Sequence, residues 1–261
     1  FKLSYVDSMS KGKERTIALI PARMGSSRFP GKPMEKINGI PMIEHVYRRV
    51  SMSKTLFTTY VATCDKEIFD HIKKIGGNVV MTSKKHTRAS DRCAEGLLKI
   101  EKKKKIKFDI IVMVQGDEPM TTSSMISQSI KPFRKQKSIK VVNLFSKFEN
   151  LKEFNNPNTI KVVRDKNDNA IYFTRNLDKK YFYSKSKRVG KQVCIIPFRR
   201  EYLLKFIKLK PTFLEILESI DMWRFLENNI EVKMANTNSL SFAVDHPSDI
   251  QKTKKYLPKK Y

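Results

Sequence analysis

The feature that most constrains the fold of this chain is the regular alternation, over its first half, of short apolar runs with longer amphipathic segments. Four runs rich in apolar and β-branched residues are short enough to be buried strands: TIALIPA (16–22), TTYVAT (58–63), NVVMT (78–82) and DIIVMVQ (109–115). The segments between and after them have helical spacing: PMIEHVYRRV (41–50), KEIFDHIKKIG (66–76), SDRCAEGLLKIEK (90–102) and SSMISQSIKPF (123–133). Strands that each lead into a helix predict a parallel sheet covered on both faces. We therefore expect an α/β fold with a doubly wound, mostly parallel sheet.

The rhythm changes after about residue 138. The runs 139–148, 158–165, 169–175 and 192–198 indicate strands, 213–229 an amphipathic helix, and 245–257 an N-capped closing helix. We expect one domain over 16–257, made of a core (16–137), a smaller second lobe (138–238) and a closing segment (239–257). Residues 1–15 are polar and basic and are expected to form a disordered arm.

The net charge of +27 raises the question of a nucleic-acid partner. The lysines are spread along the chain, however, and the densest run, EKKKKIK (101–107), is typical of a solvated helix end. We expect no dedicated nucleic-acid role, although a basic nucleic-acid-binding protein stays as the alternative from a different class. The longest apolar stretches are too short to span a bilayer, so we expect no membrane contact. Three scattered cysteines indicate a reduced, cytoplasmic protein.

The stretch IPARMGSSRFPGKP (20–33) directly follows the first apolar run. Its small residues, Ala22, Gly25, Ser26 and Ser27, let backbone N–H groups approach a ligand closely, and such nests bind phosphate. Three cations, Arg23, Arg28 and Lys32, add charge suited to phosphate oxygens. The Walker A pattern is missing, because Pro33 follows Lys32. We name residues 23–32 the cationic loop and expect it to bind phosphate; an ordinary basic surface loop is the alternative.

Two later stretches deliver carboxylates to the ends of apolar strands. VMVQGDEPM (112–120) places Asp117 at the carboxyl edge of the expected sheet, where open α/β folds bind ligands. FAVDHPSDI (242–250) places Asp245 between an apolar run and a helix. A carboxylate facing a cationic loop suits Mg²⁺, which is held by one or two carboxylates plus substrate phosphates. The alternatives are an Asp-capped turn for Asp117 and a helix N-cap for Asp245.

Together these stretches resemble the 3-deoxy-manno-octulosonate cytidylyltransferase (CMP-Kdo synthetase) family over about residues 16–257. The landmarks are IPARMGSSRFPGKPM, INGIPMIEHVYRR, VATCD, GGNVVMT, VQGDEPM, FNNPNTIKVV, AIYFTR, LEILESIDMWR and VDHPSDI. The resemblance implies a nucleotide-diphospho-sugar-transferase-like fold and a cytoplasmic homodimer. It also implies Mg²⁺-dependent transfer of CMP from CTP to the anomeric hydroxyl of an acidic keto-sugar, with release of pyrophosphate, for surface polysaccharide synthesis.

The resemblance also implies roles for individual residues. The catalytic group would be Arg23, Lys32, Asp117 and Asp245, with Mg²⁺ held by the two aspartates. The nucleotide site in the core would comprise Ala22, Arg23, Gly25, Ser26, Ser27, Arg28, Lys32, Ser90 and Arg92. The acidic sugar would lie against Arg28, Gln115, Arg175, Gln192, Glu218 and Asp221.

This sequence departs from the family pattern in three places. RASDR (88–92) stands where the family carries SGT before an acidic residue and Arg, in the loop that reads cytosine. In QVCIIPF (192–198), Gln192 and Ile196 stand where the family has His and Tyr. Asp221 and Met222 replace a Glu-Gln pair. Two interpretations follow: an acceptor other than Kdo, such as an amino-sugar acid or a phosphonate, or drift in a tolerant pocket.

Overall fold

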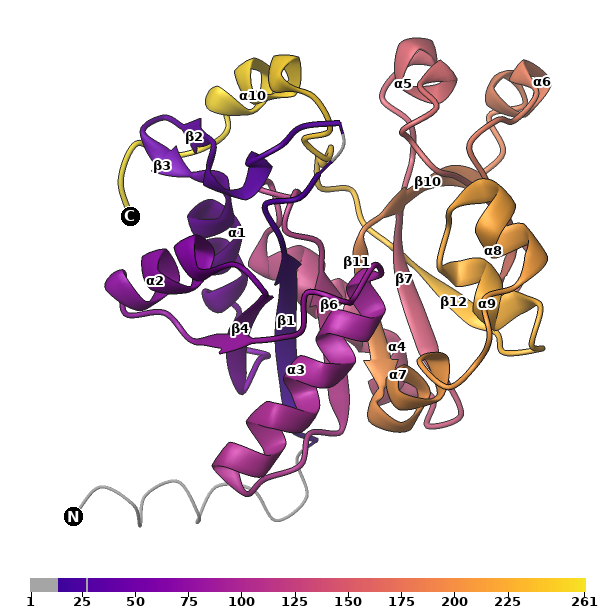
Figure 1. The fold of residues 1–261 in the computed structure, drawn as a ribbon. Helices are drawn as coiled ribbons and strands as arrows, with labels where there is room; N and C mark the ends of the chain where they lie inside the picture. Colours follow the sequence, from indigo (N-terminus) through magenta and orange to yellow (C-terminus); the bar gives the residue numbers. More distant parts are fainter. Residues whose placement is uncertain (1–13, 27) are drawn as a thin grey trace.

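The first half of the chain forms the parallel part of one large sheet, as the alternation predicts (Figure 1). The structure is a computed structural model that describes residues 14–26 and 28–261. Four neighbouring parallel strands run in the order β5 (Val79–Met81), β4 (Thr58–Thr63), β1 (Thr16–Ala22) and β6 (Ile110–Val114). Four helices follow them in sequence: α1 (Met42–Ser51), α2 (Lys66–Lys74), α3 (Ala89–Lys104) and α4 (Ser123–Lys135). The expected doubly wound α/β fold is confirmed.

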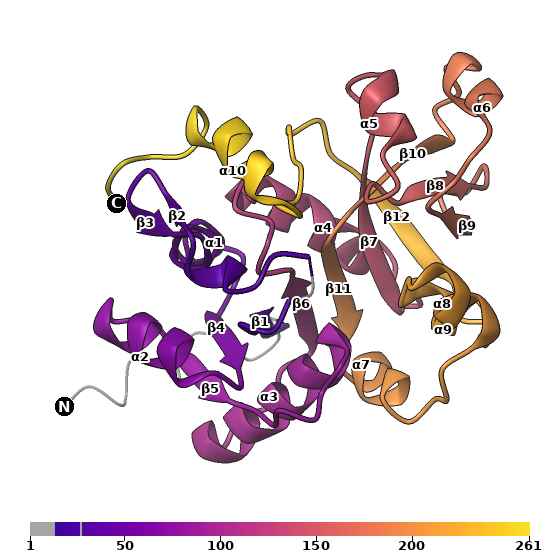
Figure 2. The same cartoon turned by 45° about the horizontal axis from the view of Figure 1, so that its top comes forward.

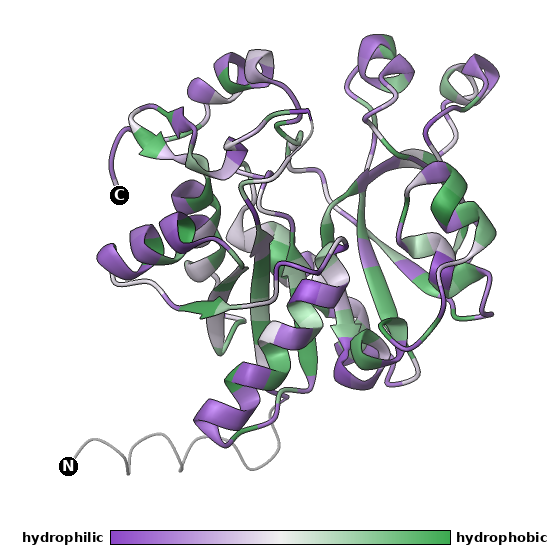
Figure 3. Ribbon diagram, in the orientation of Figure 1, coloured by the Kyte–Doolittle hydropathy of each residue, from purple (hydrophilic) through white to green (hydrophobic). Residues whose placement is uncertain are grey.

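Helices cover both faces of this sheet because its central strands are apolar on both faces. All seven residues of β1 are buried. On one face Ile17 and Leu19 pack in a cluster with residues of α3 and of α7 (Arg200–Phe206). On the other face Ala18 and Ile20 pack with residues of α1, α2 and α4. The hydropathy colouring shows the same division, with hydrophobic central strands and hydrophilic outer turns on α2 and α3 (Figure 3).

The second half of the chain extends the same sheet with mostly antiparallel pairings. Its strands are β7 (Val141–Ser146), β8 (Lys161–Arg164), β9 (Ala170–Thr174), β10 (Val189–Val193), β11 (Ile195–Arg199) and β12 (Val232–Asn236). β11 lies between β6 and β7 and is antiparallel to both, whereas β12 pairs with β7 in parallel. The core and the second lobe therefore share one sheet. One hydrophobic cluster runs from Ile17 in β1 to Phe225 in the second lobe.

The remaining elements are short and lie mainly around the rim of the sheet (Figure 2). They are η2 (Lys32–Met34), β2 (Lys36–Ile37), β3 (Ile40–Pro41), α5 (Leu151–Asn155), α6 (Lys179–Tyr183), α8 (Phe213–Glu218), α9 (Met222–Leu226) and α10 (Pro247–Lys254). The side-chain amide of Asn38, in the β2–β3 turn, donates to the carbonyls of Lys254 and Leu257 and so ties α10 to the core. Among the described residues, no helix is both long and apolar enough to cross a membrane.

Two segments of the second lobe break where the sequence predicts continuity. The expected strand 192–198 is two strands, because the backbone at Cys194 turns from β7 toward the end of β6: its N–H donates to Glu118 Oε1 and its carbonyl accepts from the Gln115 N–H. The expected helix 213–229 is two helices, because Ser219 adopts a left-handed conformation (φ 54°) that ends α8.

The starts of two helices also differ from expectation. α3 begins at Ala89 rather than after a Ser90 cap, and Ser90 lies buried inside the helix. His246, not Asp245, caps α10, so Asp245 lies outside the helix. Most of the expected arm, 1–15, lies outside the described residues, as does Ser27. At the arm's end the Arg15 N–H donates to Asp109 at 2.7 Å and Glu14 pairs with Arg199.

Candidate active site

The cationic loop lies at the carboxyl end of β1, and its one buried cation is Lys32. Gly31 adopts a left-handed conformation (φ 73°) just before Lys32, which opens the short helix η2. The Lys32 ammonium donates to Asp117 Oδ2 at 2.6 Å and to the Val244 carbonyl at 2.9 Å. Lys32 therefore contacts both of the chain segments that carry the predicted carboxylates, the one after β6 and the irregular one before α10. The end of the cationic loop is thus fixed to the core of the protein through a buried side chain.

The two predicted metal ligands, Asp117 and Asp245, lie side by side. The Val244 N–H donates to the Asp117 carbonyl at 2.9 Å, which brings Asp245 next to the end of β6. Burial raises the pKa of Asp245, and the nearby Asp117 carboxylate raises it further, while Arg28 and Lys32 oppose the rise. The Asp117 and Asp245 side chains keep 25% and 15% of their surface exposed, respectively, so both remain open to a ligand.

Arg28 pairs with the second of these two carboxylates, Asp245. Its guanidinium lies 2.9 Å from Asp245 Oδ1 and also donates to Asn158 Oδ1 at 2.7 Å. The Asn158 side-chain amide in turn lies 3.1 Å from His246 Nε2. The Asn-Pro-rich run 155–158 belongs to one of the sequence landmarks, but no role was predicted for Asn158. Two features of the sequence could have indicated a role for Asn158: it lies at the start of an expected strand, and its amide side chain can form hydrogen bonds.

A second residue that sequence reasoning missed is Glu118. Its side chain is buried and accepts from the Ser241 hydroxyl at 2.8 Å and from the Cys194 N–H at 3.2 Å. Burial, followed by the neighbouring Asp117 charge, raises the pKa of Glu118 to about 7. Glu118 thus ties the segment after β6 to the break between β10 and β11. The adjacent carboxylates in QGDEP were the signal.

A cavity of about 210 Å³ opens beside Arg23 at the ends of β1 and β6, and we name it the core cavity. It is lined by Pro21, Ala22, Arg23, His86, Thr87, Arg88, Ala89, Arg92 and Gln115. Arg92 is mostly committed to structure, because it donates to Thr82 Oγ1 at 2.6 Å and to the carbonyls of Ser83 and His86. Three predicted nucleotide residues, Ala22, Arg23 and Arg92, therefore surround one cavity.

Two other predicted nucleotide residues are placed differently. Ser90 does not line the core cavity; its hydroxyl is buried and donates to Asp221 Oδ2 at 3.1 Å. The Ser26 N–H, expected to be free for phosphate, donates to the Met24 carbonyl at 2.9 Å. Gly25 is exposed, with nothing within 4 Å of where a Cβ would stand, so the backbone there is open to a ligand.

A neighbouring cavity, also about 210 Å³, lies between the core and the second lobe, and we name it the lobe cavity. Its lining includes Gln115, Gln192 and Asp221 of the predicted sugar residues, together with the apolar Ile196 and Met222. Gln192 donates to the buried Asn143 on β7. A larger cavity of about 990 Å³ extends from Gln192 past Glu118 and Asp245.

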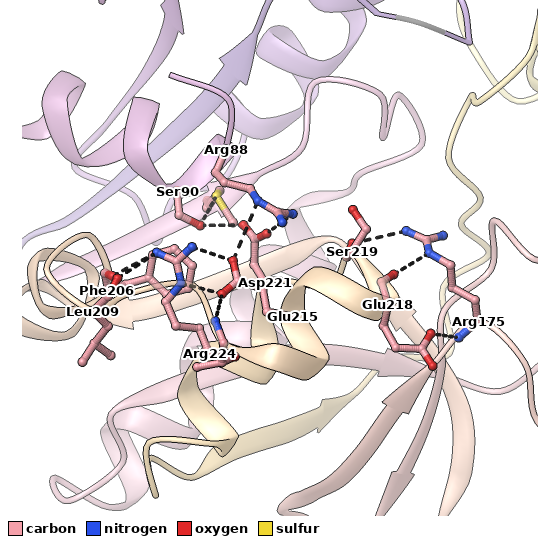
Figure 4. A network of polar contacts seen from close by, with 12 residues as sticks. Arg88, Ser90, Arg175, Phe206, Leu209, Glu215, Glu218, Ser219, Asp221 and Arg224 are labelled. Carbon is pink, nitrogen blue, oxygen red and sulfur yellow. Dashed lines mark hydrogen bonds and ion pairs between the residues drawn. The ribbon is translucent and has the colours of Figure 1, made fainter. Parts of the chain in front are cut away.

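Arg175 and Glu218 contact each other at the end of α8 (Figure 4), and neither residue lines the lobe cavity. The Arg175 guanidinium donates to the carbonyls of Glu218, Pro157 and Ser219 at 2.8–3.3 Å. The Glu218 carboxylate accepts from Thr174 Oγ1 at 3.0 Å and from the Arg175 N–H at 2.9 Å. Both residues hold the end of α8 in place, because their polar groups are used by neighbouring chain segments.

A cationic loop that faces two carboxylates at the carboxyl edge of an α/β sheet is the arrangement of a nucleotidyltransferase. The chain belongs to the cytidylyltransferase family, whose sequence model matches residues 17–235. It is therefore an enzyme of the nucleotidyltransferase class.

Relatives of known name agree with this assignment. The 3-deoxy-manno-octulosonate cytidylyltransferase of Trichlorobacter lovleyi is 38% identical over 252 residues, covering 92% of this chain and 98% of the relative. That of Thermodesulfovibrio yellowstonii is also 38% identical, covering 93% of this chain and 98% of its own.

Solved structures give the same picture. A CMP:2-keto-3-deoxy-manno-octonic acid synthetase complexed with CTP is similar with a TM-score of 0.82 and 30% identity, over 93% of this chain and 98% of that one. The 4-diphosphocytidyl-2C-methyl-D-erythritol synthase of Anaerococcus prevotii has a TM-score of 0.60 at 17% identity, over 93% of this chain and 96% of that one. At that identity the likeness shows the fold alone.

Proposed function

We propose that this enzyme transfers CMP from CTP to the anomeric hydroxyl of Kdo, releases pyrophosphate, and thereby supplies an activated acidic sugar for surface polysaccharide synthesis. The observation that carries the proposal is the contact set of Lys32 and Arg28 with Asp117 and Asp245 at one sheet edge. The printed names of relatives that cover nearly the whole chain support Kdo as the acceptor. The CTP complex of the similar synthetase supports CTP as the donor.

The triphosphate would lie along the cationic loop. Arg23 is exposed beside the core cavity, and Arg28 keeps 47% of its side-chain surface exposed. Before substrate binds, Arg28 and Lys32 neutralise the two aspartates. A triphosphate offers them stronger, multiply charged acceptors, so we expect both cations to turn toward its oxygens. Transfer at phosphorus depends mainly on such positioning and charge neutralisation.

The donor set of Asp117 and Asp245 fits Mg²⁺. Two adjacent carboxylates are hard oxygen ligands. The Asp117 charge, which adds to the effect of burial in raising the pKa of Asp245, produces a repulsion that a cation between the two carboxylates would relieve. In the described part of the chain, no three His, Cys, Asp or Glu side chains form a metal-binding group by themselves. Mg²⁺ fits such a partial site, because it usually keeps water and substrate phosphate as its other ligands. When bound, the ion would supply charge stabilisation at the α-phosphate and lower the pKa of the acceptor hydroxyl.

The lobe cavity gives a specific reason to test a second acceptor. Ile196 and Met222 present apolar atoms there, and both side chains are buried. A sugar hydroxyl that meets these side chains loses its hydrogen bond to water without a replacement, at roughly 1–3 kcal/mol each. An amino-sugar acid, a deoxy analogue or a phosphonate is the second candidate, transferred by the same chemistry.

We further propose a cytoplasmic homodimer. All three cysteines are free, which suits a reducing compartment. On α8 the side chains of Phe213, Ile216 and Leu217 are 73%, 64% and 67% exposed. Their spacing of three and four residues places them on one helix face. An apolar stripe this exposed is the expected contact for a second copy of the chain.

The test of the proposed activity is pyrophosphate release from CTP and Mg²⁺ with a panel of acceptors. The panel contains Kdo, its amino and deoxy analogues and a phosphonate, and each is measured as kcat/KM at saturating CTP. We expect turnover with Kdo. Turnover confined to another acceptor would show that the lobe cavity has changed specificity. The absence of pyrophosphate with every acceptor would overturn the proposed function.

A further inference from the structure

Asp221, at the turn between α8 and α9, is held by two residues from the start of α3 (Figure 4). Arg88 Nη1 lies 3.0 Å from Asp221 Oδ1, and the Ser90 hydroxyl donates to Oδ2 at 3.1 Å. Both carboxylate oxygens of Asp221 therefore face the core, although Asp221 belongs to the second lobe. The two contacts join residues that are far apart in the chain. Ser90 and Asp221 are 131 positions apart, and Arg88 and Asp221 are 133 positions apart.

These contacts lie at the wall between the two small cavities. Thr87, Arg88, Ala89 and Gln115 line both the core cavity and the lobe cavity. Asp221 lines the lobe cavity only. The segment 87–89 is thus one wall with a cavity on each side, and the Arg88–Asp221 pair fixes that wall to the second lobe.

The lobe side of this contact is firmly anchored. Arg224 donates to the fully buried Glu215 through Nε at 2.7 Å and Nη2 at 2.5 Å, and its N–H donates to the Asp221 carbonyl. Arg88 Nε lies 3.8 Å from Glu215, too far for a hydrogen bond, so Asp221 is its near partner. The turn that carries Asp221 is therefore held in place from the side of the second lobe. A ligand that binds against Asp221 in the lobe cavity also constrains Arg88, because Arg88 contacts Asp221 directly.

We propose that Arg88 is a positioning residue that, through Asp221, couples nucleotide binding in the core cavity to acceptor binding in the lobe cavity. The inference rests on the proposed function and adds a thermodynamic link between its two substrates. A ligand on either side that holds the 87–89 wall in place spares the second ligand the cost of ordering it, so each tightens the other. By linkage the effect is reciprocal, and couplings of this kind span about 5- to 150-fold.

The test measures binding without turnover. The probe is α,β-methylene-CTP, which cannot transfer CMP, titrated in Mg²⁺ buffer with and without saturating Kdo. For the wild type we expect Kdo to lower the Kd of the analogue by about 10-fold, within the range usual for coupled sites. The variants are Arg88→Ala, Asp221→Asn and Arg88→Lys. We expect less than about a 2-fold effect of Kdo in the first two and partial recovery with lysine, which keeps the charge but not the planar fork.

A matched control separates coupling from stability. Arg200 pairs with Glu101, also on α3, through two contacts of 2.8 Å, and its side chain is 25% exposed compared with 27% for Arg88. Neither residue of this pair lines the cavities. Arg200→Ala should lower Tm about as much as Arg88→Ala while leaving the coupling at its wild-type value. If Arg88→Ala does not fold, the nearly isosteric Asp221→Asn supplies the comparison.

The outcomes distinguish this inference from the activity on which it rests. Wild-type turnover of Kdo decides the proposed function without any variant. If the wild type uses Kdo but Kdo leaves the Kd of the analogue unchanged, the inference is wrong and the function stands. The inference is equally wrong if Arg88→Ala and Asp221→Asn keep wild-type coupling, or if Arg200→Ala loses coupling to the same extent.

Discussion

The Lys32 ammonium lies 2.6 Å from the Asp117 carboxylate and 2.9 Å from the Val244 carbonyl, so one cation joins the cationic loop to both carboxylate-bearing segments. Such a group does two things. It offsets the charge of Asp117 before substrate binds, and we expect it to bind the phosphates of CTP when that substrate is present. The first role concerns the resting site, and the second concerns the transition state.

Replacing Lys32 with alanine should therefore weaken catalysis more than folding. Loss of a charged phosphate ligand is expected to remove about 2–4 kcal/mol of transition-state stabilisation, or about 30- to 1,000-fold in kcat/KM for CTP. Steady-state pyrophosphate release at varied CTP measures this. Lys36→Ala, an exposed lysine on the adjacent β2, is the control and should keep wild-type activity. Unchanged kcat/KM in Lys32→Ala would contradict a role in binding phosphate.

The paired aspartates predict a metal requirement. Asp117→Asn and Asp245→Asn should each lower kcat by at least about 100-fold, because each removes charged oxygen ligands from the proposed Mg²⁺ site. Chelation with EDTA should abolish wild-type turnover, and added Mg²⁺ should restore it. Asp70→Asn, on exposed α2, is the charge-matched control. Full activity in EDTA, or in either site variant, would show that the two carboxylates hold no essential ion.

Asn158 should act through Arg28. Its side-chain oxygen accepts from Arg28 at 2.7 Å, at the point where Arg28 also pairs with Asp245. Asn158→Ala is expected to raise KM for CTP about 5- to 10-fold, the size expected from loss of one hydrogen bond to a charged group near solvent. Asn167→Ala, in the exposed turn between β8 and β9, supplies the control. A normal KM with a lowered Tm would assign Asn158 a purely structural role.

The sequence predicted the parallel half of the fold well because its information there is local. Each of its strands is a short run rich in apolar and β-branched residues, and Gly76 (φ 75°) follows the end of α2 where the pattern predicts it. The breaks at Cys194 and Ser219 escaped prediction for a physical reason. Cys194 turns because Gln115 and Glu118, far away in the sequence, take its hydrogen bonds, and Ser219 carries no glycine-like signal for a left-handed residue.

The difference between local and long-range information also explains which contacts at the candidate active site the sequence could not predict. Lys32, Asp117 and Asp245 could be named from motifs because each lies in a short stretch of distinctive sequence that comes after an apolar run. The contact of Ser90 with Asp221, and those of Arg175 with the α8 end, depend on how the second lobe folds back on the core. A motif assigns a residue to a site, but long-range packing decides which of its polar groups remain free.

The protonated Glu118 side chain stabilises the folded protein, and this contribution to the free energy of unfolding falls as the pH rises. Burial raises its pKa from the ordinary value of 4.5 to about 7 in the folded state. The folded state therefore holds the proton more tightly than the unfolded chain does. The favourable contribution is complete below about pH 4.5, declines as the pH rises, and is lost above about pH 7. Relative to glutamine, the ionised carboxyl costs on the order of 3 kcal/mol above pH 7.

Urea unfolding of Glu118→Gln and of the wild type in EDTA, between pH 5 and 8, checks this prediction. As the pH rises, the free energy of unfolding of Glu118→Gln should increase relative to that of the wild type, by up to about 3 kcal/mol. Glu67→Gln, at the exposed start of α2, serves as the control. The difference in free energy of unfolding between this variant and the wild type should not change with pH. Parallel pH profiles for Glu118→Gln and the wild type would contradict the raised pKa.

The exposed face of α8 predicts that the proposed dimer can be separated into monomers without loss of the fold. Leu217 is 67% exposed and lies on the same helix face as Phe213 and Ile216, so in an isolated chain it contributes little to the core. Leu217→Asp would bury a charge in a contact between two copies, at a cost of several kcal/mol per copy. We expect sedimentation velocity to show a dimer for the wild type and a monomer for Leu217→Asp. At equal chain concentration the two proteins should have nearly the same Tm, once the stabilisation that dimer formation gives the wild type is subtracted. Leu98→Asp, on α3 of the core and 44% exposed, is the matched control and should remain dimeric. A monomeric wild type would overturn the proposed assembly, and a dimeric Leu217→Asp would move its interface away from α8.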